Sequence, residues 1–282
     1  MSNENDDFYE GTCGYFEGQK TLEEMTLIPD ESELLNLFHT DGDRFRSDFK
    51  CSAQEFVYGG LLESGWRRSG NIFYRENCPQ CKKCLGIRLY VDRFSPSKSQ
   101  RKSVRKNADL ELTLSSVPED LVTDEKVQLM KNYDRRHKKG TDETDESDED
   151  VRDSLVWLNG IKNGKKQYSG TFNMDYRLNG KLIAVGVVDK GEGALSSNYF
   201  YYDISDDSLK RSLGVFSVIQ EIEACRGNLF DGTLKSDLYY LGYYIADCKK
   251  MNYKIQYRPN QLLIDGVWTD SEKLEDSIDE MR

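Results

Sequence analysis

The stretch that most constrains the fold is Ser196–Glu223, where an aromatic segment, a short acidic loop and an amphipathic run follow one another. Tyr199–Asp203 has the aromatic composition typical of half-buried strands. In the later run, apolar residues recur at helical spacing, which predicts a helix with one apolar face against a sheet: Val215, Val218, Ile219 and Ile222. The first turn of this helix, Arg211-Ser-Leu-Gly214, offers free backbone N–H groups to a phosphate or an oxyanion. An ordinary helix cap is the alternative interpretation.

The rest of the chain alternates between strand-like and helix-like segments. Asn179-Gly180 separates two apolar runs and is a strong hairpin signal. Helices are predicted at 52–63, 97–107, 119–137, 212–226 and 244–251, and strands at 87–94, 110–114, 171–178, 181–189, 194–203, 238–241 and 254–257, with a hairpin over 66–75. This order predicts an α/β (α+β) fold with a mixed sheet. We expect an N-terminal unit at 1–120, a second unit at 121–269 and an acidic tail at 270–282.

Charge is concentrated in two segments. The formal net charge is −11, and the net charges of 141–150 (−7) and of the tail 270–282 (−4) account for all of it. The remainder is therefore neutral and can still carry a local basic patch. The acidic run 141–150 is expected to be a mobile loop. The sequence contains no apolar run long enough to cross a bilayer and no signal-like N-terminus, so a soluble cytoplasmic protein without membrane contact is expected.

Three of the seven cysteines lie in one tight cluster, Cys78-Pro-Gln-Cys81-Lys-Lys-Cys84. This spacing suits a zinc site or an iron–sulfur loop, because a tight turn directs several thiolates at one ion. The fourth ligand is not local; Cys13 is the first candidate and Cys51 the second. A cluster of free thiols is the alternative.

A second cluster is cationic. Four of its residues share one face of the predicted helix 97–107, with no acid among them, and suit a phosphate backbone: Lys98, Arg101, Lys102 and Arg105. A solvated helix face is the plainer interpretation. Other catalytic classes lack the residues that they require. His39 and His137 are the only histidines, and no GxSxG, GxxxxGK[ST] or GxGxxG motif occurs.

Several short segments, spread in order over about 13–268, resemble a known family. They are Cys13-Gly-Tyr15, Gly65-Trp-Arg-Arg-Ser-Gly70, Tyr74-Arg75, Cys78/Cys81/Cys84, Arg88, Phe94-Ser-Pro-Ser-Lys-Ser-Gln-Arg101, Asn107, Tyr201-Tyr-Asp203, Arg211-Ser-Leu-Gly214, Tyr240-Leu-Gly-Tyr243, Met251-Asn-Tyr-Lys254 and Tyr257-Arg-Pro259. Together they resemble the aminoacyl-tRNA–protein transferases, which comprise eukaryotic arginyltransferases and bacterial aspartate/glutamate leucyltransferases. Phe16 and Lys83 stand where eukaryotic members have further cysteines.

The resemblance implies a fold and an activity. The fold would be a tandem acetyltransferase-like (GNAT-like) fold with largely antiparallel sheets. The activity would be transfer of arginine or leucine from charged tRNA to the α-amino group of proteins that begin with Asp or Glu, which marks them for the N-degron pathway. The donor ester is already activated, so no cofactor is expected for the chemistry. Positioning and oxyanion stabilisation would supply most of the rate.

This hypothesis assigns roles to named residues. Arg211, Ser212, Leu213 and Gly214 would hold the tRNA 3′ end, and Lys98, Arg101, Lys102 and Arg105 the acceptor stem. Asp203 and Tyr202 would accept a proton or orient the amine, and Tyr243 would orient the ester. The acidic side chain of the acceptor would bind Arg258, Lys254 or Arg88. Cys13, Cys78, Cys81 and Cys84 would hold the zinc ion or iron–sulfur cluster.

Two other classes of protein stay open at this point. One is a GNAT-type acyltransferase acting on small molecules. Arg211–Phe216 follows its coenzyme A pattern [QR]xxGx[GA] except at the last position, where the bulk of Phe216 disfavours coenzyme A. The other is a noncatalytic, metal-containing RNA-binding protein, which transfer of a labelled amino acid would eliminate.

Overall fold

The computed structural model describes residues 7–137 and 146–274. The helices are α1 (Glu31–Leu37), α2 (Gly42–Phe49), α3 (Ala53–Glu63), α4 (Lys98–Lys106), α5 (Pro118–Leu121), α6 (Asp124–His137), α7 (Asp148–Leu158), α8 (Asp206–Leu209) and α9 (Leu213–Cys225), with 3-10 turns η1 (Phe230–Gly232), η2 (Asn252–Gln256) and η3 (Ser271–Leu274). The strands are β1 (Phe8–Thr12), β2 (Lys20–Leu27), β3 (Arg67–Ser69), β4 (Ile72–Glu76), β5 (Leu85–Tyr90), β6 (Leu110–Ser115), β7 (Ile161–Lys162), β8 (Lys165–Lys166), β9 (Thr171–Leu178), β10 (Lys181–Gly191), β11 (Ala194–Tyr202), β12 (Leu238–Tyr244), β13 (Gln261–Ile264) and β14 (Val267–Asp270).

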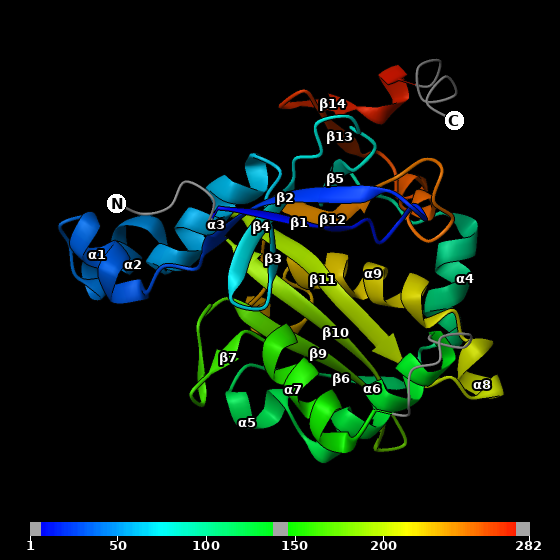
Figure 1. Ribbon diagram of the computed structural model, residues 1–282. Helices are drawn as coiled ribbons and strands as arrows, with labels where there is room; N and C mark the ends of the chain where they lie inside the picture. Colours follow the sequence, from blue (N-terminus) through cyan, green and yellow to red (C-terminus); the bar gives the residue numbers. More distant parts are fainter. Residues whose placement is uncertain (1–6, 138–145, 275–282) are drawn as a thin grey trace.

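An eight-stranded sheet forms the centre of the molecule (Figure 1), in the order β14-β13-β5-β12-β11-β10-β9-β6. Its strand pairs are antiparallel except β11 with β12, which run parallel. The prediction of a mixed α/β protein with largely antiparallel sheets is therefore confirmed.

Helices cover both faces of this sheet because its central strands are apolar on both sides. Along β10, Val185 and Val187 pack in the cluster formed with α6 and α7. Ala184 and Val188 point to the opposite face and pack in the larger cluster formed with α9. Side chains alternate between the faces of a strand, so one continuous apolar run serves two cores.

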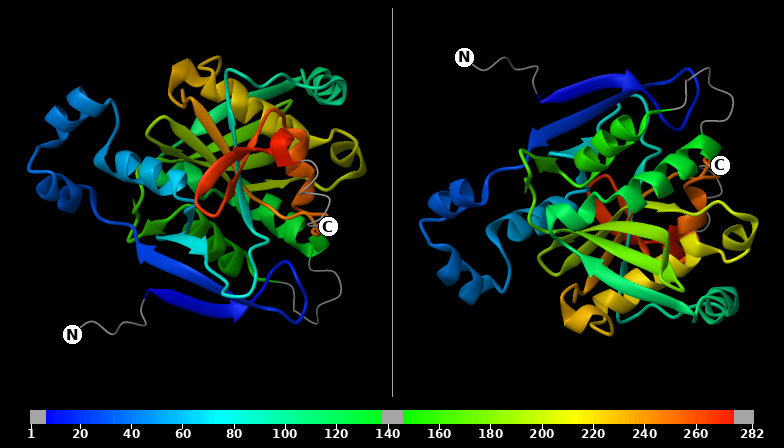
Figure 2. Two further views of the ribbon diagram at one scale, coloured as in Figure 1. Left: turned by 90° about the horizontal axis from the view of Figure 1, so that it is seen from above. Right: turned by 90° about the horizontal axis from the view of Figure 1, so that it is seen from below.

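A smaller antiparallel sheet, in the order β1-β2-β4-β3, lies against the end of the large one. Helix α3 packs beside it, with Tyr58 and Phe73 stacked at 4.9 Å between ring centroids. In the two views of Figure 2, α1 and α2 lie at one end of the molecule, away from the large sheet. They enclose their own aromatic cluster around Phe45.

Several local predictions are confirmed. Ser52 and Ser97 cap α3 and α4, each in a capping box with a residue three positions on. Asn179 and Gly180 both have positive φ, 51° and 80°, as a two-residue hairpin turn requires. The hairpin over 66–75 turns at Gly70, which also has positive φ.

Three local predictions are wrong. No helix forms over 244–251, because β12 continues through Tyr244 and the chain then turns. The segment 254–257 is not a strand: residues 254–256 belong to η2 and Tyr257 follows its end, and the last strands are β13 and β14. The end of the acidic run is not a loop, since Ser147 caps α7 and Asp148–Asp150 form its first turn, where carboxylates are favourable. The part of the run before residue 146 lies outside the described residues.

The eight-stranded sheet takes strands from both sides of residue 120, because β5 and β6 belong to it. The proposed boundary between units at that position stays a prediction. Within the described ranges, no helix is both long and apolar enough to span a bilayer.

Candidate active site

The central cavity, of about 730 Å³, opens where the two parallel strands separate. β11 and β12 pair only between 194–196 and 238–240. Beyond these residues β12 is irregular at Gly242, whose φ of 78° a side chain would strain. Residues from both strands then line the cavity: Ser197, Asn198, Tyr199, Phe200 and Tyr202 from β11, and Leu241, Gly242 and Tyr243 from β12.

Helix α9 begins at one end of this cavity. Ser212 is in the left-handed conformation, with φ of 56°, and its side chain does not cap the helix. The backbone N–H groups of Leu213 and Gly214 have no acceptor among the described residues. Gly214 lines the cavity, and a Cβ added there would meet no atom within 4 Å. The start of α9 is therefore open, as the prediction for the tRNA 3′ end requires.

Arg67 contributes a buried cation to the cavity wall. Its side chain extends from β3, and the residue is only 4% exposed. The guanidinium donates hydrogen bonds to the carbonyl oxygens of Trp66 (2.7 Å) and Gly242 (3.1 Å), whereas its Nε has no partner. Within the described parts of the chain no carboxylate forms an ion pair with it. Burying a guanidinium without an acid is costly, so this cation is prepared for an anion that the chain does not supply.

Lys254 places a second cation beside Arg67. Its Nζ donates to the carbonyl oxygen of Tyr243 at 3.0 Å, and no ion pair with an acid is present in the described ranges. Burial, reinforced by the nearby Arg67, lowers the pKa of Lys254 to about 7. A carboxylate bound between Arg67 and Lys254 would offset the cost of burying the Lys254 charge and the repulsion between the two cations.

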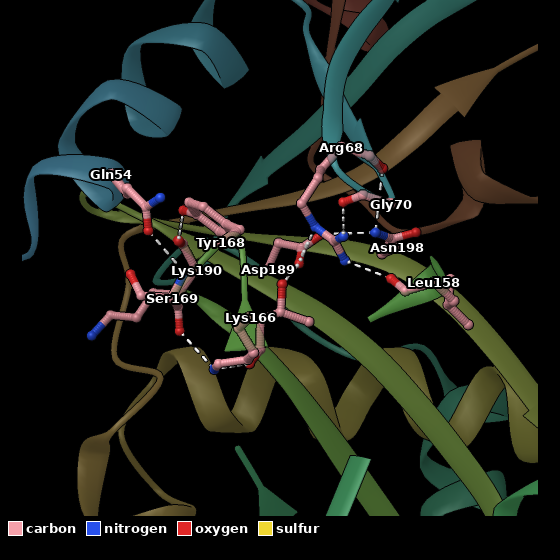
Figure 3. A network of polar contacts seen from close by, with 11 residues as sticks. Gln54, Arg68, Gly70, Leu158, Lys166, Tyr168, Ser169, Asp189, Lys190 and Asn198 are labelled. Atoms are coloured by element: carbon pink, nitrogen blue, oxygen red, sulfur yellow. Dashed lines mark hydrogen bonds and ion pairs between the residues drawn. The ribbon is translucent and has the colours of Figure 1, made fainter. Parts of the chain in front are cut away.

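The adjacent Arg68 is already neutralised (Figure 3). Its Nε lies 2.7 Å from Asp189 Oδ1, and these side chains are 0% and 1% exposed. Its other nitrogens donate to the carbonyl oxygens of Gly70 and Leu158. Asp189 also accepts from Thr171 and Asn198, each at 2.8 Å. This network fixes the β3–β4 hairpin on the large sheet and leaves Arg67 as the cation available to a ligand.

The three predicted catalytic residues lie at different distances from this centre. Tyr202 and Tyr243 line the central cavity. Asp203 does not; it lies in a separate cavity of about 520 Å³ and accepts from the hydroxyl groups of Ser205 (2.6 Å) and Ser208 (2.8 Å). Burial would raise the pKa of Asp203, but these hydrogen bonds outweigh it and hold the pKa below its usual value. Such a carboxylate is a weak proton acceptor.

Arg211 and the predicted tRNA-binding residues of α4 do not line the central cavity. Arg211 forms a bidentate ion pair with Asp109, at 2.8 and 3.0 Å. The buried side of α4 holds the turn before α9, since Asn107 donates to the Arg211 carbonyl oxygen. The cationic side chains of α4, Lys98, Arg101, Lys102 and Arg105, are exposed on the opposite side of that helix.

Of the predicted acceptor-binding cations, only Lys254 lines the cavity. Arg88 is buried but forms an ion pair with Glu63 and donates to Gln261 at 3.0 Å. Arg258 is exposed and donates to the Ile255 carbonyl oxygen. Neither belongs to the cavity lining.

Comparison with known proteins assigns the family. A family model described as arginine-tRNA-protein transferase, N terminus, matches residues 11–102, and one described as its C terminus matches residues 125–264. This chain belongs to the arginine-tRNA-protein transferase family. An aspartate/glutamate leucyltransferase of Pseudomonas putida is 37% identical over 214 residues, which cover 75% of this chain and 82% of that protein. One from Saccharophagus degradans is 35% identical over 224 residues, or 78% and 86% of the two chains.

Solved structures are more distant from this transferase. The C-terminal domain of a putative lysylphosphatidylglycerol synthetase from Agrobacterium fabrum aligns with a TM-score of 0.40 and 13% identity, covering 85% of this chain and 70% of that one. FemX aligns with a TM-score of 0.39 and 9% identity, covering 88% and 83%. Likenesses this weak add nothing to the family assignment.

The transferase also has a cysteine cavity, of about 360 Å³, which is lined by Cys13, Cys78, Cys81 and Cys84. All four thiols are free and half-buried, and burial together with nearby Glu76 raises the pKa of Cys84. Four thiols suit zinc or an iron–sulfur cluster, although no three metal-binding side chains of the described residues are arranged to hold an ion. Cys51 lies elsewhere, in the aromatic cluster of α1 and α2. Tyr243 lines both cavities and forms part of the wall between them.

Sequence reasoning missed two residues of the transferase site. Arg67 lies in the motif Gly65-Trp-Arg-Arg-Ser-Gly70 next to Arg68, and the signal for its separate role is that a strand sends neighbouring side chains to opposite sides. Glu221 was not considered. It lies between Val218 and Ile222 on α9 and is 1% exposed. An acid inside an apolar helix face was the available signal.

Proposed function

We propose that this transferase moves an amino acid from aminoacyl-tRNA to the α-amino group of a protein that begins with Asp or Glu. The observation that carries the proposal is the cation pair of buried Arg67 and half-buried Lys254 in the central cavity, with no acid among the described residues to pair with either. An N-terminal acidic side chain supplies the missing anion, and a guanidinium can bind it through two hydrogen bonds. The α-amino group is a few bonds away and would then lie within the cavity.

The open start of α9 suits the other substrate. Its free N–H groups at Leu213 and Gly214 would bind the terminal phosphate or ribose of the tRNA 3′ end. Tyr202 flanks this point and also lines the central cavity. The ester carbonyl carbon would thus lie between the helix start and the cation pair, where the acceptor amine can reach it.

We further propose leucine, rather than arginine, as the amino acid donated. The cavity wall near α9 is apolar and includes Phe200, Val218 and Leu241. A guanidinium would require a free acid, but the one carboxylate in the described lining, Asp189, is engaged by Arg68. The printed names of the relatives from Pseudomonas putida and Saccharophagus degradans agree with leucine.

The reaction itself requires little activation. The acceptor nitrogen attacks the ester carbonyl carbon, the bond from that carbon to the ribose 3′-oxygen breaks, and the amine proton ends on that oxygen. Tyr243 is held by the Gly65 carbonyl oxygen and the Glu76 N–H, at 3.4 and 3.3 Å, so its ring is fixed beside the cation pair. Its proposed role is to orient the ester.

The remaining assignments of the family stay proposals. Lys98, Arg101, Lys102 and Arg105 would bind tRNA phosphates along the exposed side of α4. Zinc or an iron–sulfur cluster would be held by Cys13, Cys78, Cys81 and Cys84. It would fasten the Cys13 loop to the 78–84 turn, and with that loop Tyr15 of the cavity wall. We also propose a tandem GNAT-like fold, which the separation of β11 and β12 supports. The remaining proposals are a cytoplasmic location and a role in the N-degron pathway.

The direct test compares two donors and two acceptors. Leucyl-tRNA and arginyl-tRNA would be offered to matched peptides beginning with Asp or Asn, and the products followed by mass spectrometry. We expect leucine on the Asp peptide and none without charged tRNA. Transfer of neither amino acid to the Asp peptide would refute the proposed activity, and arginine transfer alone would refute the proposed donor.

A further inference from the structure

A carboxyl group is buried behind the wall of the central cavity. Glu221, on α9, is 1% exposed. Its Oε2 accepts a hydrogen bond of 2.6 Å from the hydroxyl group of Tyr239, on β12. Ser197, on β11, also hydrogen-bonds to it. No cation forms an ion pair with Glu221 within residues 7–137 and 146–274.

Glu221 is connected to the central cavity by its two hydrogen-bond partners. Ser197 and Tyr239 both line the cavity, on the two strands that separate there. On α9, Gly214 and Val218 line it too, and Glu221 follows them at helical spacing on the same side of the helix. The hydroxyl groups therefore connect Glu221 to the space between the open start of α9 and the cation pair.

A structural role does not account for a carboxyl group at this position. Burying an acid costs free energy unless it is paired, and a neutral glutamine or an apolar side chain would avoid that cost. Glycine at 186 leaves room for the group, since a Cβ there would lie 3.4 Å from Glu221 Oε1. Such an arrangement is typical of a group whose proton is used.

The groups around Glu221 are polar and carry no formal charge near neutral pH. They comprise Ser197, Tyr239, Tyr176 of β9, Cys225 of α9, and Tyr253 and Tyr257 near η2. Burial raises the pKa of Glu221 to about 7, against the hydrogen bonds of Tyr239 and Ser197. The α-amine of a protein has an ordinary pKa of about 7.7–8.0, so the two groups can exchange a proton near neutral pH.

We propose that Glu221 is the store for the proton that the acceptor amine loses, with Tyr239 as the hydroxyl group between them. The inference rests on the proposed function. The α-ammonium gives a proton to the Tyr239 oxygen while the Tyr239 proton passes to the Glu221 carboxylate, and the neutral amine attacks the ester. When the bond to the ribose 3′-oxygen breaks, the proton returns by the same hydroxyl group to that oxygen. The attacking nitrogen loses its second proton to water as the amide forms, so transfer from the α-ammonium releases one proton overall, and water is the only further acceptor needed.

The test is the pH profile of single-turnover transfer to an Asp peptide. In the unaltered protein we expect the rate to fall as pH drops below about 7, because protonated Glu221 accepts no proton. Glu221→Gln keeps the shape and should lower the rate about 100-fold at pH 7, with the limb near pH 7 replaced by one at the pKa of the α-amine itself, about 7.7–8.0, and KM for the peptide unchanged. Tyr239→Phe should do the same. Tyr176→Phe is the matched control, since it removes a buried hydroxyl group beside Glu221 that has no partner, and should leave rate and profile unchanged.

Three outcomes would overturn the proposal while leaving the transferase activity intact. They are an unchanged rate in Glu221→Gln, a lower rate with the limb near pH 7 retained, and a KM effect alone. If Glu221→Gln does not fold, Tyr239→Phe carries the same test. Infrared spectroscopy of the protein gives a readout independent of turnover. The protonated-carboxyl band should disappear between pH 6 and pH 8 and be absent from Glu221→Gln; no such band in the unaltered protein refutes the inference.

Discussion

Replacing Arg67 with glutamine tests the acceptor site most directly. Arg67 and Lys254 are cavity cations that are not exposed and have no acid among the described residues, and an acceptor carboxylate would receive charge-assisted hydrogen bonds from both. Each such bond contributes about 1.5–3 kcal/mol, and two are lost from a bidentate guanidinium. We take about 3–4 kcal/mol for the pair, because Lys254 remains and glutamine still offers one N–H donor. At 1.36 kcal/mol for each factor of ten, kcat/KM for an Asp peptide should fall about 100- to 1,000-fold.

The assay measures a ratio rather than a rate. Transfer to peptides that begin with Asp and with Asn is compared in the same preparation, so partial misfolding lowers both values equally. The unaltered protein should prefer Asp strongly, and Arg67→Gln should bring the two within about tenfold, since Asn presents no charge for Arg67 to recognise. Arg75→Gln is the matched control, because this arginine lies on the same hairpin but is paired with Glu24 at 2.7 Å. An unchanged Asp preference in a folded Arg67→Gln protein would show that the acidic side chain binds elsewhere.

Four further predictions follow from the described contacts. Lys254 has a pKa of about 7 in the folded protein and about 10.5 in the unfolded chain, so the folding free energy of the unaltered protein should become more favourable as the pH rises from 7 to 10. Lys254→Met should remove this pH dependence, as measured by thermal unfolding. Asp189→Asn should destabilise by about 3–5 kcal/mol in urea titration, because it leaves Arg68 buried and unpaired; a loss below 1 kcal/mol would contradict this. Cys81→Ser should abolish metal retained through purification, measured by elemental mass spectrometry, whereas Cys51→Ser should not; equal contents in both would exclude the cysteine cavity as the site. Arg101→Glu should weaken tRNA binding at low salt and flatten its salt dependence, and unchanged affinity would remove α4 from the interface.

Much of the fold follows from local signals in the sequence. The Asn179-Gly180 turn, the capping serines 52 and 97 and the apolar stripe of α9 each specify an element through backbone conformation or periodicity alone. The errors fall where tertiary contacts decide. Tyr244–Met251 has helical composition, but β12 extends through Tyr244 because it pairs with Leu85 of β5, which is distant in sequence.

The availability of the site residues also depends on tertiary contacts that the local sequence does not reveal. Arg67 and Arg68 are neighbours of the same residue type, yet Asp189 neutralises Arg68 while no acid in the described part of the chain pairs with Arg67. The sequence favours Arg88 over Lys254 because an arginine can pair with a carboxylate through two hydrogen bonds, yet Glu63 occupies Arg88 and Lys254 lines the cavity. Pairing between residues 121 positions apart, for Arg68 and Asp189, and 25 apart, for Arg88 and Glu63, decides which cations are available, and no local pattern in the sequence records it.

The position of β5 has a consequence for how the protein can be divided. This strand lies between β12 and β13, although it comes from the N-terminal part of the chain. A C-terminal fragment that starts near residue 121 would lack it and would expose the unpaired backbone of both neighbours, which invites aggregation. Such a fragment should become soluble only when the peptide 1–120 is produced with it, so a split version of this transferase would report on whether its two pieces meet in the cell.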